Sequence, residues 1–162
     1  TTVLSAPHSM EFPYTRSTGP MVGAFLTGLR DRRVLGVQDS TGRVVVPPPE
    51  YDVATAAQLP SDGLVEVGPE GVVTSWSWNP VPRLGQPFDR PFAWALVQLD
   101  GADTALLHAL DASADQISTG MRVRIRWADE TTGYISHPRV SPKADAIAFL
   151  DQCAALPKDR RD

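Results

Sequence analysis

Hydrophobic and polar residues alternate along residues 72–78 of the chain. On an extended strand, this pattern places Val72, Thr74, Trp76 and Trp78 on one face and the residues between them on the other. A period of two is typical of a strand with one buried face. Residues 92–99 are apolar on both faces, which predicts a central strand, and the turn signal that follows predicts a further strand at 104–109.

Strict alternation returns in residues 121–127. The side chains expected to point inward are Val123, Ile125 and Trp127, and those expected to point outward are Arg122, Arg124 and Arg126. We expect a short helix or turn at 111–120 and a last strand at 133–140. Five strands in this layout match an OB-fold, a small Greek-key barrel, and periodicity alone leaves other small barrels open.

A helical pattern precedes the strands. It starts at Pro20, a residue suited to the first helical position, and three arginines follow at its negative C-terminal end. Its apolar side chains recur at helical spacing, at Met21, Val22, Phe25, Leu26 and Leu29. A hairpin with strands at 34–38 and 43–46 comes next. A second helix is predicted over residues 141–157.

These elements divide the chain into four segments. Residues 1–17 are an arm of mixed polarity, 18–63 hold the first helix and the hairpin, 64–140 form the barrel, and 141–162 hold the second helix and a charged tail. The expected fold is mainly β. It is a five-stranded OB-fold barrel preceded by an N-terminal helix and a hairpin and followed by a C-terminal helix.

The composition narrows the function classes. The 162 residues carry a formal net charge of -4, which argues against electrostatic capture of nucleic acid, because that usually needs a basic face. The single cysteine, Cys153, allows no internal disulfide and no multi-cysteine metal site. No apolar segment approaches the roughly 20 residues that a membrane helix needs, so we expect a cytoplasmic protein without membrane contact.

The sequence offers little for catalysis. His8, His108 and His137 are far apart and lack the spacing of metal ligands on a helix. We expect His108 to be packed or solvent-facing and Cys153 to be an inert buried thiol. No nucleophile elbow, phosphate loop or dinucleotide fingerprint occurs. The expectation is a chain without catalytic residues, metal ligands or cofactors.

Several side chains have two interpretations. The stripe formed by Arg122, Arg124 and Arg126 is either a solvated strand face or a docking surface for an acidic partner or for the phosphates of a bulky ligand such as CoA. Trp76, Trp78 and Phe92 are either core residues or, together with Arg90, anchors of a protein interface, where Trp and Arg are enriched.

The first helix carries more apolar surface than a hairpin can cover. We therefore expect it to bury that face against a second chain or a long groove, through Met21, Phe25 and Leu29.

The order of the elements and three short motifs resemble a known family. The motifs are Gly71-Val-Val-Thr-Ser-Trp-Ser-Trp, Arg90-Pro-Phe-Ala-Trp-Ala-Leu-Val-Gln-Leu-Asp-Gly and Ile117-Ser-Thr-Gly-Met-Arg-Val, after a hairpin at 36–46 that ends in Pro-Pro. The likeness spans residues 19–140. It is to the acyl-CoA-associated family that joins a rubredoxin-like zinc ribbon to an OB-fold, known as domain of unknown function 35.

Members of that family are typically non-catalytic partners of thiolase-superfamily enzymes. The resemblance implies an accessory subunit of a thiolase-like aldolase of the lipid-transfer-protein type, which cleaves the side chain of a steroid acyl-CoA. It also implies a heterotetramer of two plus two subunits that meets acyl-CoA through the partner. The open alternatives are a partner of an ordinary thiolase or condensing enzyme, a single-strand nucleic-acid binder, and a stand-alone enzyme using His108 or His137.

The chain departs from the family at the zinc ribbon. Where the family places its first cysteine pair this chain has Gln38 and Thr41, and the second pair would fall at 52–55, where there is no cysteine either. Tetrahedral zinc is held by four Cys or His ligands, and none can be assembled here. We expect no zinc, and expect apolar contacts and the partner to hold this segment together.

Overall fold

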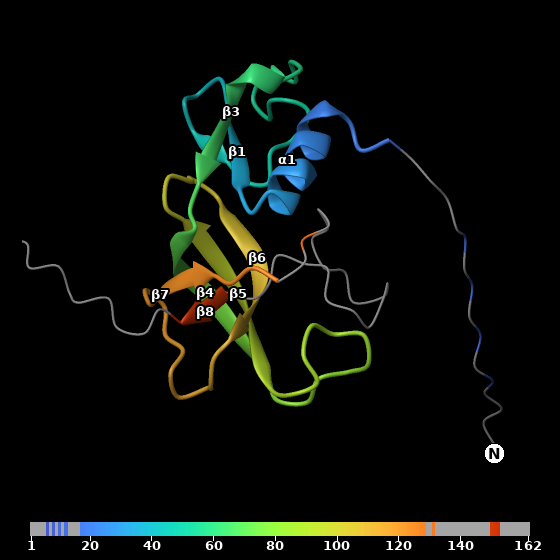
Figure 1. The fold of residues 1–162 in the computed structure, drawn as a ribbon, viewed down its shortest axis with the longest axis vertical. Coiled ribbons are helices and arrows are strands. Elements are labelled where there is room, and N and C mark those ends of the chain that lie inside the picture. Colours follow the sequence, from blue (N-terminus) through green and yellow to red (C-terminus); the bar gives the residue numbers. More distant parts are fainter. Residues whose placement is uncertain are drawn as a thin grey trace, which may run out of the picture.

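The structure is a computed structural model that describes residues 17–128, together with residues 6, 8, 10, 12, 131 and 150–152. A three-stranded sheet with one helix lies at one end of these residues and a closed five-stranded barrel at the other (Figure 1). The mainly β class predicted from the alternating patterns is confirmed.

The helix α1 spans Pro20–Arg30, inside the segment with helical spacing. Its N-cap residue, Gly19, provides no side-chain cap. Glu50 takes over this role from a distant part of the chain, because its Oε1 accepts hydrogen bonds from the backbone N–H groups of Met21 and Val22 at 3.0 and 3.1 Å. A carboxylate at this position also offsets the positive end of the helix dipole.

The small sheet has β1 (Val34–Gln38) at its centre, antiparallel to β2 (Val44–Val45) and to β3 (Leu64–Val67). The hairpin of β1 and β2 lies where the sequence predicts it. Residues 64–67, where the sequence analysis expects the barrel to begin, form β3 and pair with β1 in this sheet. That register places Val34 opposite Val67, and both side chains are buried.

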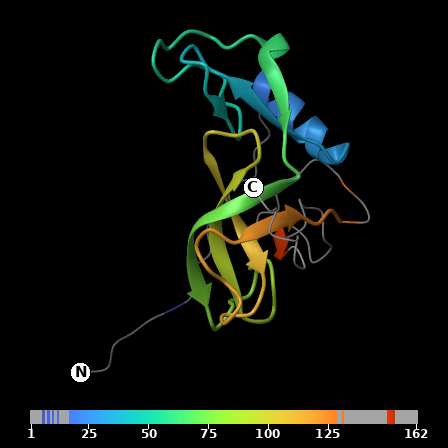
Figure 2. The ribbon, with the colours of Figure 1, turned by 90° about the vertical axis from the view of Figure 1, so that its left-hand side faces the viewer.

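The barrel closes in the strand order β4-β5-β6-β8-β7. Its strands are β4 (Glu70–Asn79), β5 (Phe92–Leu99), β6 (Ala105–Asp111), β7 (Arg122–Ile125) and β8 (Leu150–Gln152). β8 runs parallel to β6 and antiparallel to β7, and all other pairs are antiparallel. Figure 2 shows β3 leading from the small sheet down into the barrel.

β8 corrects the end of the predicted fold. Residues 150–152 form a strand that completes the barrel, and therefore do not belong to the helix predicted over 141–157. The rest of that helix and the strand predicted at 133–140 lie outside the described residues. Residues 112–120 contain turns and no helix.

A β-bulge changes which side chains of β4 share a face. Val73 pairs with Val97, but Ser75 pairs with Leu96, so Thr74 is an extra residue on this strand. A bulge moves every following side chain to the opposite face. Val73 points into the core before the bulge, and after it Trp76 and Trp78 lie opposite the buried Ala95 and Ala93. The prediction that Val72 shares a face with the two tryptophans is therefore wrong.

One hydrophobic core runs through both parts of the molecule. It joins Phe25 and Leu29 of α1, Val34, Val46 and Val67 of the small sheet, and the inward residues of the barrel. Met21 belongs to a smaller cluster with Val37 and Leu59. Because Met21, Phe25 and Leu29 are at most 2% exposed, the apolar face of α1 is covered within the chain, and these side chains cannot reach a partner. The sequence prediction failed because it counted only the hairpin as cover, whereas β3 and the barrel contribute too.

Polar contacts also tie the two parts together. The hydroxyl of Thr104 accepts a hydrogen bond from the backbone N–H of Val46 at 2.8 Å and donates one to its carbonyl at 3.0 Å. The neighbouring Asp103 accepts one from the backbone N–H of Val44. These hydrogen bonds join the turn between β5 and β6 to residues 44–46 of the small sheet.

Candidate partner-binding surface

An apolar stripe runs along the outside of β5. We call it the outer stripe and define it as Phe92, Trp94 and Leu96 of β5 with Leu107 of β6. The three β5 residues alternate with Ala93, Ala95 and Val97, which point into the core. Leu107 lies directly opposite Leu96 on the neighbouring strand. Successive outward side chains on one strand are neighbours, so the four form a continuous band.

Burial decreases along the outer stripe. Phe92 is fully buried, Trp94 is half-buried, and Leu96 and Leu107 are 39% and 58% exposed. A strand face that meets water normally carries polar side chains. A directly opposed pair of exposed leucines therefore marks this end of the stripe as a surface suited to covering by another molecule.

The buried end of the stripe is held by the loop between β4 and β5. Phe88 packs against Phe92 with ring centroids 5.4 Å apart, and Phe92 meets the edge of Trp94 at 5.3 Å. The guanidinium of Arg90 lies 4.8 Å from the centre of the Phe88 ring. The loop also presents Leu84, whose side chain is fully exposed.

The aromatic and arginine residues predicted to bind a partner have different surroundings. Phe92 is covered by its own chain, so it supports the stripe from below and cannot itself be an exposed anchor. Trp78 is half-buried and packs against the core. Trp76 keeps 36% of its surface exposed, and the Arg90 side chain is 53% exposed. Only the last two remain accessible.

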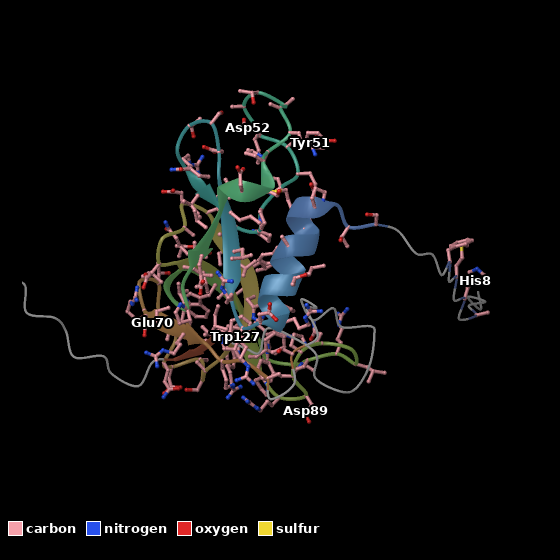
Figure 3. All side chains as sticks on the ribbon, turned by 45° about the horizontal axis from the view of Figure 1, so that its top comes forward. His8, Tyr51, Asp52, Glu70, Asp89 and Trp127 are labelled. Atoms are coloured by element: carbon pink, nitrogen blue, oxygen red, sulfur yellow. The ribbon has the colours of Figure 1, made fainter. Side chains whose placement is uncertain are left out.

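The arginine stripe is paired with carboxylates of its own chain. Arg122 binds Asp100 at 2.5 Å and Glu70 at 3.2 Å, and Arg124 also binds Glu70. Arg126 and Arg90 both bind Asp111, at 2.8 and 2.6 Å. We call these seven residues the ion-pair ladder. Glu70 is labelled on the side of the barrel in Figure 3.

The arginines of the ion-pair ladder lower the pKa values of its three acidic residues. Arg124 and then Arg122 lower the pKa of Glu70, Arg122 lowers that of Asp100, and Arg90 followed by Arg126 lowers that of Asp111. Each arginine stabilises the charged carboxylate. Phosphates would have to compete with three carboxylates already in place, which weighs against the ladder as a ready phosphate site.

The two turns at the zinc-ribbon positions are held by carboxylates. Asp39 accepts hydrogen bonds from the N–H and hydroxyl groups of Thr41 at 2.8 and 2.6 Å. Asp52 is 3% exposed. Hydrogen bonds from the backbone and side chain of Ser40, and then from the backbone of Thr55, hold the pKa of Asp52 well below its usual range. These positions carry no metal-binding set: among the residues described, no three His, Cys, Asp or Glu could hold a metal ion.

Of the candidates for catalysis, the described residues include only His8 and His108. His108 is buried on β6, with Nδ1 3.1 Å from the carbonyl of Ala109, and His8 is exposed. His137 and Cys153 lie outside the described residues. None of the helices in the described part of the chain is long and apolar enough to cross a membrane.

Comparison with known families identifies the barrel. Residues 64–128 match the family model for the C-terminal OB-fold domain of ChsH2. Residues 64–128 are therefore similar to this OB-fold domain. The resemblance found in the sequence is thereby confirmed.

Two solved structures have a similar fold. One is a protein of unknown function of the DUF35 family from Sulfolobus solfataricus, with 23% identity, a TM-score of 0.55, and coverage of 67% of this chain and 77% of that chain. The other is a chain of the Ltp2-ChsH2(DUF35) aldolase, with 23% identity, a TM-score of 0.53, and coverage of 67% and 84%. Comparison with curated proteins gives no match.

The exposed pair formed by Leu96 and Leu107 was not predicted from the sequence. Its signal was present, because residues 92–99 are apolar on both faces. Such a run was interpreted as a strand buried on both sides, and periodicity does not reveal whether the outer face is covered. The hydrogen bonds that Asp52 accepts were not predicted either, since a single acidic residue in an irregular segment has no distinctive pattern.

Proposed function

We propose that this protein is a non-catalytic accessory subunit that binds and stabilises a thiolase-like aldolase of the lipid-transfer-protein type, which cleaves the side chain of a steroid acyl-CoA. The observation that carries the proposal is the match of residues 64–128 to the ChsH2 OB-fold family. It is supported by the likeness in fold to a chain of the Ltp2-ChsH2(DUF35) aldolase.

The docking surface in this proposal is the exposed end of the outer stripe. Leu96 and Leu107 supply its apolar centre, and Leu84 and Arg90 are further accessible candidates. Trp76 is also partly exposed, but it lies opposite Ala95 and therefore on the other face of the sheet. Interfaces bury a small number of apolar anchors inside a polar rim. Arg90 and Asp111 at the end of β6 supply charged groups for such a rim.

The reacting groups in this proposal belong to the partner. The described residues contain no set of three potential metal ligands, and His108 is a buried residue of the barrel strand β6. Acyl-CoA then meets this subunit through the partner, in an assembly of two plus two chains.

Co-expression with a thiolase-like protein encoded beside it tests the proposal. We expect one complex on size-exclusion chromatography with light scattering, with a mass equal to two copies of each chain. The complex should cleave the side chain of a steroid acyl-CoA by a retro-aldol reaction, and each chain alone should be inactive or unstable. Separate elution with a fully active lone enzyme contradicts the proposal. Thiolysis in place of retro-aldol cleavage would indicate an ordinary thiolase as partner.

A gel-shift assay at low salt covers the nucleic-acid alternative. We expect no shift, since the net charge is -4 and Arg122, Arg124 and Arg126 are paired with carboxylates. Tight binding of a single strand would favour that alternative.

A further inference from the structure

We propose that the carboxylate of Asp52 replaces the zinc ion of the zinc-ribbon family as the crosslink between the two turns of the N-terminal sheet. This inference does not depend on the proposed function. It adds a polar crosslink within the chain to the apolar contacts and the partner that the sequence analysis expects to hold the segment together.

The two oxygens of Asp52 face different turns. Oδ2 accepts a hydrogen bond of 2.7 Å from the backbone N–H of Ser40, in the turn between β1 and β2. Oδ1 accepts hydrogen bonds of 2.8 and 2.9 Å from the backbone N–H groups of Ala54 and Thr55, in the second turn. One carboxylate thus joins two segments that are 12 positions apart in the sequence.

These turns lie where the resemblance to the zinc-ribbon family implies its two cysteine pairs. The first turn lies between Gln38 and Thr41, and the second covers residues 52–55. A structural zinc ion stabilises such a pair of turns by binding side chains from both. In this chain the charges are reversed. A buried carboxylate accepts hydrogen bonds from backbone N–H groups of both turns, whereas a zinc ion would bind thiolates from both.

The surroundings of Asp52 suit this role. Its side chain is 3% exposed, so water does not compete strongly for its oxygens. The main chain on both sides is fixed by bonds from Asp52 N–H to the Ala57 carbonyl and from Ala56 N–H to the Asp52 carbonyl. Figure 3 shows Asp52 beside Tyr51 at the end of the molecule remote from the barrel strands. Hydrogen bonds to an ionised acceptor are about twice as strong as neutral ones.

Substitution by asparagine tests the bidentate arrangement. An amide has one acceptor oxygen, so its NH₂ group must face an N–H donor of one of the two turns. We expect Asp52→Asn to accelerate hydrogen exchange at the amides of Ser40, Ala54 and Thr55 by at least about tenfold and to lower the midpoint of thermal unfolding. Asp62→Asn is the matched control, because Asp62 is an exposed acid in η1 (Ser61–Gly63) and its loss should change neither quantity.

Metal analysis of the full chain after dialysis gives the second measurement. We expect well below one zinc per chain, and an unfolding midpoint that is the same with and without a chelator. One tightly bound zinc per chain, or a chelator-induced decrease in the midpoint, would overturn the proposal. So would an Asp52→Asn protein that exchanges these amides as slowly as Asp62→Asn. Failure of Asp52→Asn to fold, while Asp62→Asn folds, supports it.

Discussion

Replacing both exposed leucines of the outer stripe by threonine should weaken partner binding without unfolding the chain. Leu96→Thr and Leu107→Thr keep a residue that favours β-strands but remove the apolar end of each side chain. Neither side chain contributes to the core, since both point outward from the barrel. Because both side chains are partly covered already, the free energy of unfolding should fall by no more than about 1 kcal/mol per substitution, which leaves the chain folded.

The expected loss of affinity follows from the exposed surface. Leu96 is 39% exposed and Leu107 is 58% exposed, so a partner that covers both buries the equivalent of about one whole leucine side chain. Burial of one leucine is worth roughly 1.5–3 kcal/mol. At about 1.4 kcal/mol for each factor of ten, the double variant should bind roughly 10 to 100 times more weakly.

Titration calorimetry or surface plasmon resonance with the co-expressed partner measures this change. Val53→Thr is the matched control, because Val53 is 89% exposed in the loop next to Asp52, away from the outer stripe. It replaces an apolar methyl by a hydroxyl and should leave affinity unchanged. If the double variant binds as tightly as the unaltered chain, the outer stripe is not the docking surface. If Val53→Thr alone weakens binding, the contact lies at the remote loop.

Three further predictions concern the fold and its charges. Phe25→Asp should abolish folding of the whole chain rather than only partner binding, because Phe25 is 1% exposed in the shared core; circular dichroism of the variant decides this, and a native spectrum would contradict it. Gly71→Ala should lower the free energy of unfolding, measured in urea, by about 1–3 kcal/mol, because the added Cβ would lie 2.5 Å from the Gln98 carbonyl oxygen. Gly63→Ala is the control and should have little effect, because its Cβ would have no neighbour nearer than 3.8 Å. The acids of the ion-pair ladder have lowered pKa values, so their stabilisation is complete above their ordinary values of 4.5 and 3.8 and is lost as the pH falls through the lower, folded values. The gap in unfolding midpoint between the unaltered chain and Arg122→Gln should hence be constant from pH 7 to about 5 and narrow below that, and a gap that widens in acid would refute the ladder as its source.

Local patterns in the sequence located most of the strands. The helical spacing after Pro20, the hairpin signal after β1 and the alternation in β7 each depend on residues close in sequence, and each element lies where its pattern indicates. The mutual arrangement of elements did not follow from such patterns. Residues 64–67 pair with residues 34–37 of β1, which are about 30 positions away in the sequence. The periodicity of residues 64–67 alone does not reveal which strand they pair with.

The candidate site was predictable only in part. A single inserted residue, Thr74, reverses the faces of Trp76 and Trp78, and nothing in the local sequence distinguishes a bulged strand from a regular one. The outward direction of Arg122 and Arg124 was inferred correctly from alternation. Their carboxylate partners come from β4 and from the turn after β5, so the neutralisation of the stripe required the folded arrangement.

The hydrogen bonds between Thr104 and Val46 have a practical consequence for anyone dissecting this molecule. Residues 64–128 are the stretch that matches the family model. A fragment cut to these residues would lack β1, the pairing strand of β3, and would leave Val67 uncovered. It would also lose the hydrogen bonds between Thr104 and Val46. Transplanting the barrel into a relative, or trimming it for crystallisation, should therefore carry residues 19–63 along as part of the same cooperative piece.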